Sequence, residues 1–203
     1  MKLYDGGKAP NPRRVRIFLA EKGIDVPLET VDMTALGHKS EMIASRNPLQ
    51  RLPVLELDDG TIISESVAIC RYFEELHPEP PLMGVDAVDK AIVEMWQRRM
   101  ELNLLLLVAN VFRHAHPAMA DWEVPQIKEF SEANKPKVLA TMDWMNEELK
   151  YREYIAGDRF TIADIAAMIA IDFLKPARLQ VPENHKHLLA WHQRMKARPS
   201  ADA

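Results

Sequence analysis

The residues from Asn47 to Phe73 read NPLQRLPVLELDDGTIISESVAICRYF and carry the clearest structural pattern in the chain. An apolar run from Leu52 to Leu57 predicts a strand, Asp58 to Gly60 supply the residues of a tight turn, and Thr61 to Ile63 predict a second strand. Helical spacing begins directly afterwards, with Ser64 in the position of an N-cap. The stretch therefore predicts a β-hairpin that leads into a helix.

Both ends of this hairpin carry groups that would suit a small peptide. Pro53 has no N–H to give to a sheet, which places it at a strand start and leaves the backbone of Leu52 available to an extended ligand. A helix N-terminus offers unpaired N–H groups and the positive end of a dipole, so a ligand carboxylate would lie at Ser66 and an ammonium group at Glu65. Taken alone, the two features are more often an edge strand and an ordinary helix cap.

The residues before the hairpin predict the rest of a compact α/β unit. Asn11 as N-cap, Pro12 at the first helical position and Gly23 after the last turn predict a helix. Strands are expected at residues 2–4 and near residues 28–31, and a short helix is expected to end before Asn47. The order β-α-β-α-β-β-α is that of a thioredoxin-like domain.

The second half of the chain predicts helices only. Closely spaced prolines in the segment from Glu79 to Gly84 cannot continue a helix and predict a linker. Beyond it, helices are expected over residues 87–113, around residues 138–149, after the capping box Thr161-Ile162-Ala163-Asp164, and over residues 186–197. We therefore expect a thioredoxin-like α/β domain (1–78), a linker (79–86) and an all-α domain (87–203).

Composition narrows the class of protein without naming one. The 203 residues include 26 basic and 30 acidic side chains, with no basic stripe, so we expect no nucleic-acid partner. The apolar run from Leu102 to Phe112 is too short to span a bilayer, so we expect no membrane partner either. Cys70 is the single cysteine, which excludes an internal disulfide, and the chain begins without a signal-peptide pattern. A cytoplasmic location is the expectation.

The hairpin stretch resembles the glutathione transferase family. The motifs that carry the resemblance are Asn47-Pro48, Leu52-Pro53-Val54-Leu55, Asp59-Gly60, Glu65-Ser66, Ala68-Ile69 and Tyr72. The resemblance implies a cis peptide bond at Pro53 and glutathione as co-substrate, with no other cofactor. Its cysteinyl part would pair with the backbone of Leu52 and its γ-glutamyl part would be held by Glu65 and Ser66. Its glycine carboxylate would lie near His38 and Lys39, flanked more weakly by Gln50 and Arg51, and a homodimer is expected.

Such an enzyme must favour the glutathione thiolate over the thiol. A thiol has a pKa of about 8.5, and lowering it by about two units takes ~2.7 kcal/mol. A helix N-terminus supplies typically ~0.3–1 kcal/mol and at best ~2 kcal/mol. A hydrogen bond to the charged sulfur contributes ~1.5–3 kcal/mol, so the site needs such a donor in addition to the helix.

The expected donor is missing from the loop after the first strand. Most members of the family have a tyrosine, serine or cysteine there, and the matching position is Ala9, whereas Tyr4 is expected to be structural. Lys2 to Asp5, Ala9-Pro10, Pro12, Arg14-Val15-Arg16 and Leu19 to Lys22 resemble an atypical fungal and bacterial branch that lacks this residue. The resemblance implies that the first helix and a water held by a histidine serve the thiolate. His114 is the best counterpart of that histidine, and Asn11 is the second candidate.

The histidines also have simpler interpretations. Without the resemblance, His114 is an ordinary loop histidine. The pairs His114/His116 and His185/His187 are two residues apart, and because residues at that spacing do not share a helix face, we expect no metal site.

The expected reaction is conjugation of glutathione to small, apolar electrophiles, in detoxification, with residues such as Phe112 near the second substrate. A glutathione-dependent isomerase or disulfide reductase would require a serine-rich loop or a cysteine near residues 9–11, and neither is present. A binding or scaffold protein on the same fold would bind glutathione weakly and conjugate nothing.

Overall fold

The computed structural model describes all residues from Met1 to Ala203 as two compact units. The first contains Met1–Leu82 together with Pro199–Ala203, and the second contains Met83–Arg198. The boundary at residues 82 and 83 lies inside the segment 79–86 that was expected to be a linker. The last five residues belong to the first unit, although the sequence pattern predicted them to be part of the all-α domain. Arg13 Nη2 donates to the Ala201 carbonyl at 2.9 Å, which ties this tail to the first helix.

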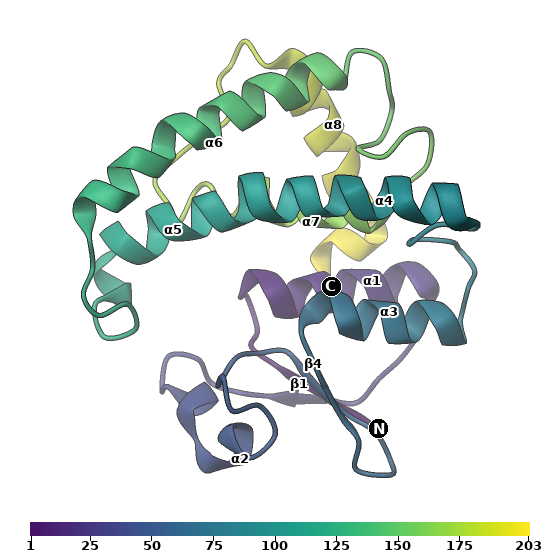
Figure 1. Cartoon of the computed structure of the whole chain (residues 1–203), viewed down its shortest axis with the longest axis vertical. Coiled ribbons are helices and arrows are strands. Elements are labelled where there is room, and N and C mark those ends of the chain that lie inside the picture. Colours follow the sequence, from purple (N-terminus) through teal and green to yellow (C-terminus); the bar gives the residue numbers. More distant parts are fainter. The chain divides into compact units, whose positions relative to one another are not determined.

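The first unit is a four-stranded mixed sheet with helices on both faces, as expected for a thioredoxin-like domain. The strand order is β2-β1-β3-β4; β1 and β2 are parallel, and β3 is antiparallel to both of its neighbours. Helices α1 and α3 lie side by side on one face, and α2 lies on the other (Figure 1). The elements are β1 (Lys2–Asp5), α1 (Pro10–Lys22), β2 (Leu28–Thr30), a 3₁₀ turn (Gly37–Lys39), α2 (Glu41–Ala44), β3 (Val54–Glu56), β4 (Ile62–Ser64) and α3 (Ser66–Leu76).

Helix α1 begins two residues earlier than its sequence signals indicate. Its N-cap is Ala9, with extended backbone, so the prediction of Asn11 as N-cap is wrong; Asn11 lies in the first turn. The reason is Pro10, whose fixed φ suits the first helical position as well as that of Pro12 does. The predicted end is confirmed, because Gly23 has φ 64° and its N–H caps the last turn.

Helix α3 also begins differently from the prediction. Ser64 is the last residue of β4 and pairs with Val54, so its backbone belongs to the sheet and it cannot act as the N-cap. The N-cap is Glu65, with φ 71°, and its side chain makes no capping hydrogen bond. The hairpin therefore passes into α3 through a residue in an uncommon backbone conformation.

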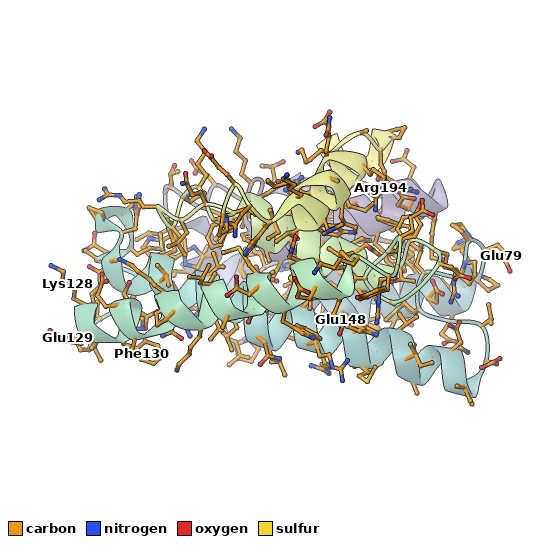
Figure 2. The ribbon with its side chains drawn as sticks, turned by 90° about the horizontal axis from the view of Figure 1, so that it is seen from above. Glu79, Lys128, Glu129, Phe130, Glu148 and Arg194 are labelled. Carbon is orange, nitrogen blue, oxygen red and sulfur yellow. The ribbon has the colours of Figure 1, made fainter.

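The second unit is helical, and its only β feature is an isolated bridge between Tyr154 and Gly157. Its helices are α4 (Ala87–Met100), α5 (Leu106–Ala115), α6 (Lys128–Glu148), α7 (Ile162–Asp172) and α8 (Lys186–Lys196), with a π-helical turn (Glu101–Leu105) and a 3₁₀ turn (Pro117–Met119). Figure 2 shows Lys128 and Phe130 at the start of α6 and Glu148 at its far end. None of the helices combines the length and the apolarity needed to cross a membrane.

Helix α7 forms the centre of the helical core. Its residues from Ile162 to Ile171 are buried, and the predicted capping box of Thr161 and Asp164 is confirmed. Asp164 also accepts hydrogen bonds from the Ile155 N–H at 2.9 Å and from Trp191 Nε1 on α8 at 3.1 Å. Burial raises the pKa of this carboxyl to about 6.

Candidate active site

Three chain segments leave the sheet of the first unit at the same end. Tyr4 pairs with Val54, and Val54 pairs with Ser64. The loop after β1, the residues just before β3 and the start of α3 therefore meet at one edge. This register brings Pro53 and Glu65 together, as the predicted site requires.

Gly6 shows how closely the loop after β1 packs against the other segments. A Cβ added at Gly6 would lie 3.2 Å from Pro12 Cγ and 3.4 Å from Leu52 Cδ1. The peptide bond between Leu52 and Pro53 is cis, as the family resemblance implied. The N–H and C=O of Leu52 make no hydrogen bond within the protein. An extended ligand can therefore pair with this backbone beside the first turn of α1.

The N-terminus of α3 is uncapped, unlike those of α4 and α7. In those helices Asp86 and Thr161 accept N–H groups of the first turn. In α3, Glu65 gives no side-chain cap, and the N–H groups of residues 66–68 have no acceptor. Residues held at positive φ without being glycine cluster at functional sites. The start of α3 is thus able to receive a carboxylate from a ligand.

Ser66 accepts a hydrogen bond from Arg14, a residue that the sequence pattern did not indicate as part of the site. Arg14, on α1, is 1% exposed, and its Nη1 donates to Ser66 Oγ at 2.7 Å. The signal in the sequence was a charge on the buried stripe of α1, because Arg14 precedes Ile17 and Phe18 by three and four residues.

The predicted glycine-carboxylate site carries its charge on Lys39 and Arg51. His38 is 2% exposed, and burial lowers the pKa of its imidazole, as do the positive charges of Lys39 and Arg51. The ring is therefore neutral at pH 7, whereas the Lys39 side chain is exposed. Asn47 fixes the neighbouring loop, since its Nδ2 donates to the Arg51 carbonyl at 2.9 Å; Gln50 lies in this loop with φ 52°.

The first turn of α1 offers a single free N–H group. Pro10 and Pro12 have none, Arg13 gives its N–H to the Ala9 carbonyl at 3.2 Å, and only the N–H of Asn11 has no acceptor. The Asn11 side chain is exposed and makes no capping bond. Tyr4 is occupied elsewhere, because its hydroxyl donates to Glu56 Oε2 at 2.7 Å.

His114 lies near the end of α5 in the helical unit. Its Nδ1 accepts the Ile127 N–H at 3.1 Å, so the neutral ring carries its proton on Nε2. Nε2 lies 3.7 Å from Glu123 Oε1, which is too far for a direct hydrogen bond. The ring edge packs on Phe130, with 5.1 Å between ring centroids, which fixes its orientation.

Other candidate residues make no comparable site. No group of three or more His, Cys, Asp or Glu side chains could hold a metal ion. Cys70 is fully buried, and burial raises the pKa of its thiol to about 12. Phe112 packs against His116 and Phe173, with 4.7 and 5.0 Å between ring centroids, and provides an apolar surface in the helical unit.

Two protein-family models match the chain. The model described as the N-terminal domain of glutathione S-transferase matches residues 9–76, and the model of the C-terminal domain matches residues 96–199. The chain belongs to the glutathione S-transferase family. Glutathione S-transferase 2 of Saccharomyces cerevisiae is 38% identical over 203 residues, which cover 98% of this chain and 87% of the yeast protein.

Solved structures of glutathione S-transferases agree with this assignment. A glutathione S-transferase domain-containing protein from Marinobacter aquaeolei VT8 has a TM-score of 0.95 at 39% identity, covering 99% of this chain and all (100%) of that one. Gtt2 from Saccharomyces cerevisiae has a TM-score of 0.94 at 38% identity, covering 100% and 99% of the two chains. These relatives are consistent with the atypical branch that the sequence resembled.

Proposed function

We propose that this glutathione S-transferase attaches the thiolate of glutathione to small, apolar electrophiles, as in detoxification. The sulfur forms a bond to an electrophilic carbon, and the leaving group departs with the electron pair of the bond that breaks. The observation that carries the proposal is the uncapped start of α3, entered through Glu65 at φ 71°, in a chain of this family. The proposed reaction uses glutathione as co-substrate and requires no other cofactor.

The charges around the sheet edge match those of glutathione. The γ-glutamyl carboxylate would accept from Ser66 and the first-turn N–H groups of α3, and the ammonium group would lie at Glu65. The cysteinyl backbone would pair with Leu52, whose own N–H and C=O are unpaired. The glycine carboxylate would lie near the His38 turn, with Lys39 supplying the positive charge.

We further propose two donors for the thiolate. The backbone N–H of Asn11 is the free donor at the start of α1, and such a bond to a charged group contributes ~1.5–3 kcal/mol. Together with the helix dipole, this reaches the ~2.7 kcal/mol that a shift of about two pKa units needs. The second donor would be a water held by the Nε2–H of His114, because the Nδ1 of this ring already accepts the Ile127 N–H. Such a water accepts from the ring, so both of its own O–H groups are free and one could donate a hydrogen bond to the thiolate.

The proposed assembly is a homodimer in the cytoplasm. Helices α4 and α5 and the π-helical turn between them expose large apolar side chains at helical spacing: Val88, Ile92, Met95, Leu102 and Leu106. Such a stripe is typical of a helix face that pairs with another chain. The cytoplasm is the compartment that keeps glutathione reduced, as the reaction requires.

The experiment that tests the function combines calorimetry with a conjugation assay. Glutathione should bind the wild-type protein, and bound glutathione should show ultraviolet thiolate absorbance at a lower pH than free glutathione. An aryl halide such as 1-chloro-2,4-dinitrobenzene should be conjugated. If glutathione binds weakly and no model electrophile reacts, the protein is a binding or scaffold protein on this fold.

Matched variants separate the proposed roles. Glu65→Gln should weaken glutathione binding, whereas Glu75→Gln, an exposed carboxylate near the other end of α3, should not. His114→Ala should retain glutathione binding but lose the low-pH thiolate signal. An unchanged thiolate signal would remove His114 from the mechanism, and Asn11→Ala would then show whether the amide side chain contributes beyond the backbone N–H.

A further inference from the structure

The first unit buries a guanidinium group between its two long helices. Arg14 projects from α1 with 1% of its surface exposed, and its Nη1 lies 2.7 Å from Ser66 Oγ at the start of α3. Moving a charged group out of water is costly, so a buried arginine needs compensating interactions. Ser66 itself is buried, at 5% exposure, so this hydrogen bond is shielded from solvent.

The bond fixes the direction of the Ser66 hydroxyl. A guanidinium group has only donors, so Ser66 Oγ must accept from Arg14. The hydroxyl proton of Ser66 then points away from Arg14 and remains available to another acceptor. Ser66 is the first residue of α3, and the N–H groups of this first turn have no acceptor within the protein. The hydroxyl and these N–H groups are thus donors gathered at one helix end.

We propose that Arg14 is a positioning residue that holds Ser66 as a donor toward the α-carboxylate of the γ-glutamyl group. This inference rests on the proposed function, in which that carboxylate binds at the start of α3. Arg14 does not touch the ligand; it acts through Ser66. Its effect is selectivity, because a ligand without the α-carboxylate gains nothing from a Ser66 hydroxyl fixed as a donor.

The test compares two ligands by calorimetry. One is glutathione, and the other is 4-aminobutanoyl-cysteinylglycine, which is glutathione without the γ-glutamyl α-carboxylate. In Arg14→Met the Kd for glutathione should rise about 10- to 100-fold, the range for a hydrogen bond to a charged group, whereas the Kd for the analogue should change less than about threefold. In steady-state assays the KM for glutathione should rise and kcat should change little.

A double-mutant cycle shows whether Arg14 acts through Ser66. Ser66→Ala should reproduce the loss of selectivity, and Arg14→Met should add little in the Ser66→Ala background. The matched control is Lys22→Met, because Lys22 is also buried between α1 and α3 but pairs with Glu74 at 2.7 Å, near the other end of α3. It should lower stability without changing the ratio of the two dissociation constants.

The outcomes separate this inference from the function on which it rests. Absence of glutathione binding by the wild-type protein would overturn both. Binding by the wild type, with equal weakening of both ligands in Arg14→Met, would overturn only the positioning role of Arg14. If Arg14→Met does not fold, Arg14→Lys serves, with a smaller loss of selectivity expected because a lysine cannot reproduce the fork of the guanidinium group.

A crystal structure of the wild-type protein with glutathione supplies an independent measurement. Ser66 Oγ should lie within hydrogen-bond distance of the γ-glutamyl carboxylate while keeping its bond to Arg14. Contact of Ser66 Oγ with the ammonium group instead would show that the hydroxyl is an acceptor for the ligand and would overturn the inference.

Discussion

At the scale of single residues, burial determines which charges a ligand can meet. Two neighbours in the 3₁₀ turn after β2 differ in this respect: His38 is buried and Lys39 is exposed. Desolvation keeps the imidazole neutral, whereas the ammonium group retains its charge. The family resemblance implied that both residues lie near the glycine carboxylate of glutathione. Their environments indicate that Lys39, and not His38, supplies the positive charge there.

Replacing Lys39 should therefore weaken ligand binding more than replacing His38. We expect Lys39→Gln to reduce the affinity for S-methylglutathione about 3- to 10-fold at low salt, and the effect should shrink as salt rises. S-methylglutathione is the appropriate ligand because it has no titrating thiol. Isothermal calorimetry at several salt concentrations makes the measurement.

The matched control is His38→Gln, which should leave the salt dependence unchanged. The folded-state pKa of His38 is lowered, so the ring is already neutral at pH 7 and affinity should vary little between pH 7 and 8. Affinity that rises steeply as the pH falls from 8 to 7 in the wild type, but not in His38→Gln, would show that the ligand binds protonated His38 and would contradict the assignment of the charge to Lys39.

At the scale of elements, the chain leading into a helix depends on close backbone contacts that intrinsic helix propensities do not describe. Gly84 precedes α4 with φ 100°, and a Cβ added there would lie 2.6 Å from Lys90 Cα. The chain thus crosses the first turns of α4 at a distance that only glycine allows. Gly60, in the hairpin turn, also has positive φ, 85°, but nothing lies within 4 Å of an added Cβ.

This contrast predicts different costs for the same substitution. Gly60→Ala should lower the free energy of unfolding by about 1 kcal/mol, the cost of a side chain at positive φ. Gly84→Ala adds a clash with the backbone of α4 and should cost about 3 kcal/mol or more. Urea unfolding of both variants makes the comparison, and equal losses would mean that α4 moves readily away from the chain at Gly84.

The buried capping residue of α7 predicts a dependence of stability on pH. Asp164 has a folded-state pKa of about 6, above its usual value of 3.8. The folded state therefore holds this proton more tightly, so the contribution is present in full below pH 4 and is lost as the pH rises through 6. The shift corresponds to about 3 kcal/mol at ~1.36 kcal/mol per unit.

Asp164→Asn provides the reference, because its side chain does not titrate. The difference in the free energy of unfolding, wild type minus variant, should fall by about 3 kcal/mol between pH 4 and pH 7. Denaturant melts at closely spaced pH values measure it. A difference that stays flat or rises over this range would mean that the four hydrogen bonds to the carboxylate, rather than its burial, dominate the pKa.

At the scale of the whole molecule, the exposed apolar stripe on α4 and α5 predicts self-association. Ile92 lies within this stripe, and Tyr151, at 88% exposure, lies outside it. If the stripe forms the dimer interface, Ile92→Glu places an unpaired charge in it and should weaken the dimer at least 100-fold, which corresponds to about 2.7 kcal/mol. Sedimentation equilibrium measures the change.

Tyr151→Glu should leave the dimer intact, since an exposed side chain outside the interface contributes nothing to it. A monomeric wild-type protein would contradict the homodimer, and a dimer unaffected by Ile92→Glu would place the interface elsewhere.

Elements with local sequence signals could be predicted from the amino-acid sequence. The Asp-Asp-Gly turn, the αL glycine at residue 23 and the capping box at Thr161 are all found where the pattern put them, because each depends on a few neighbouring residues. Together with the family resemblance, these signals were enough to predict the thioredoxin-like domain, the all-α domain and the cis peptide bond before Pro53.

Features that depend on contacts between residues far apart in the chain became visible in the folded structure and could not be predicted from local patterns. Pairing of Ser64 with Val54 moved the start of α3 to Glu65 and left it uncapped. Packing of α1 against α3 brings Arg14 within hydrogen-bond distance of Ser66, although the two residues are 52 positions apart in sequence. The physical reason is that hydrogen bonding and desolvation depend on what surrounds a group in space, and neighbours in sequence do not specify those surroundings.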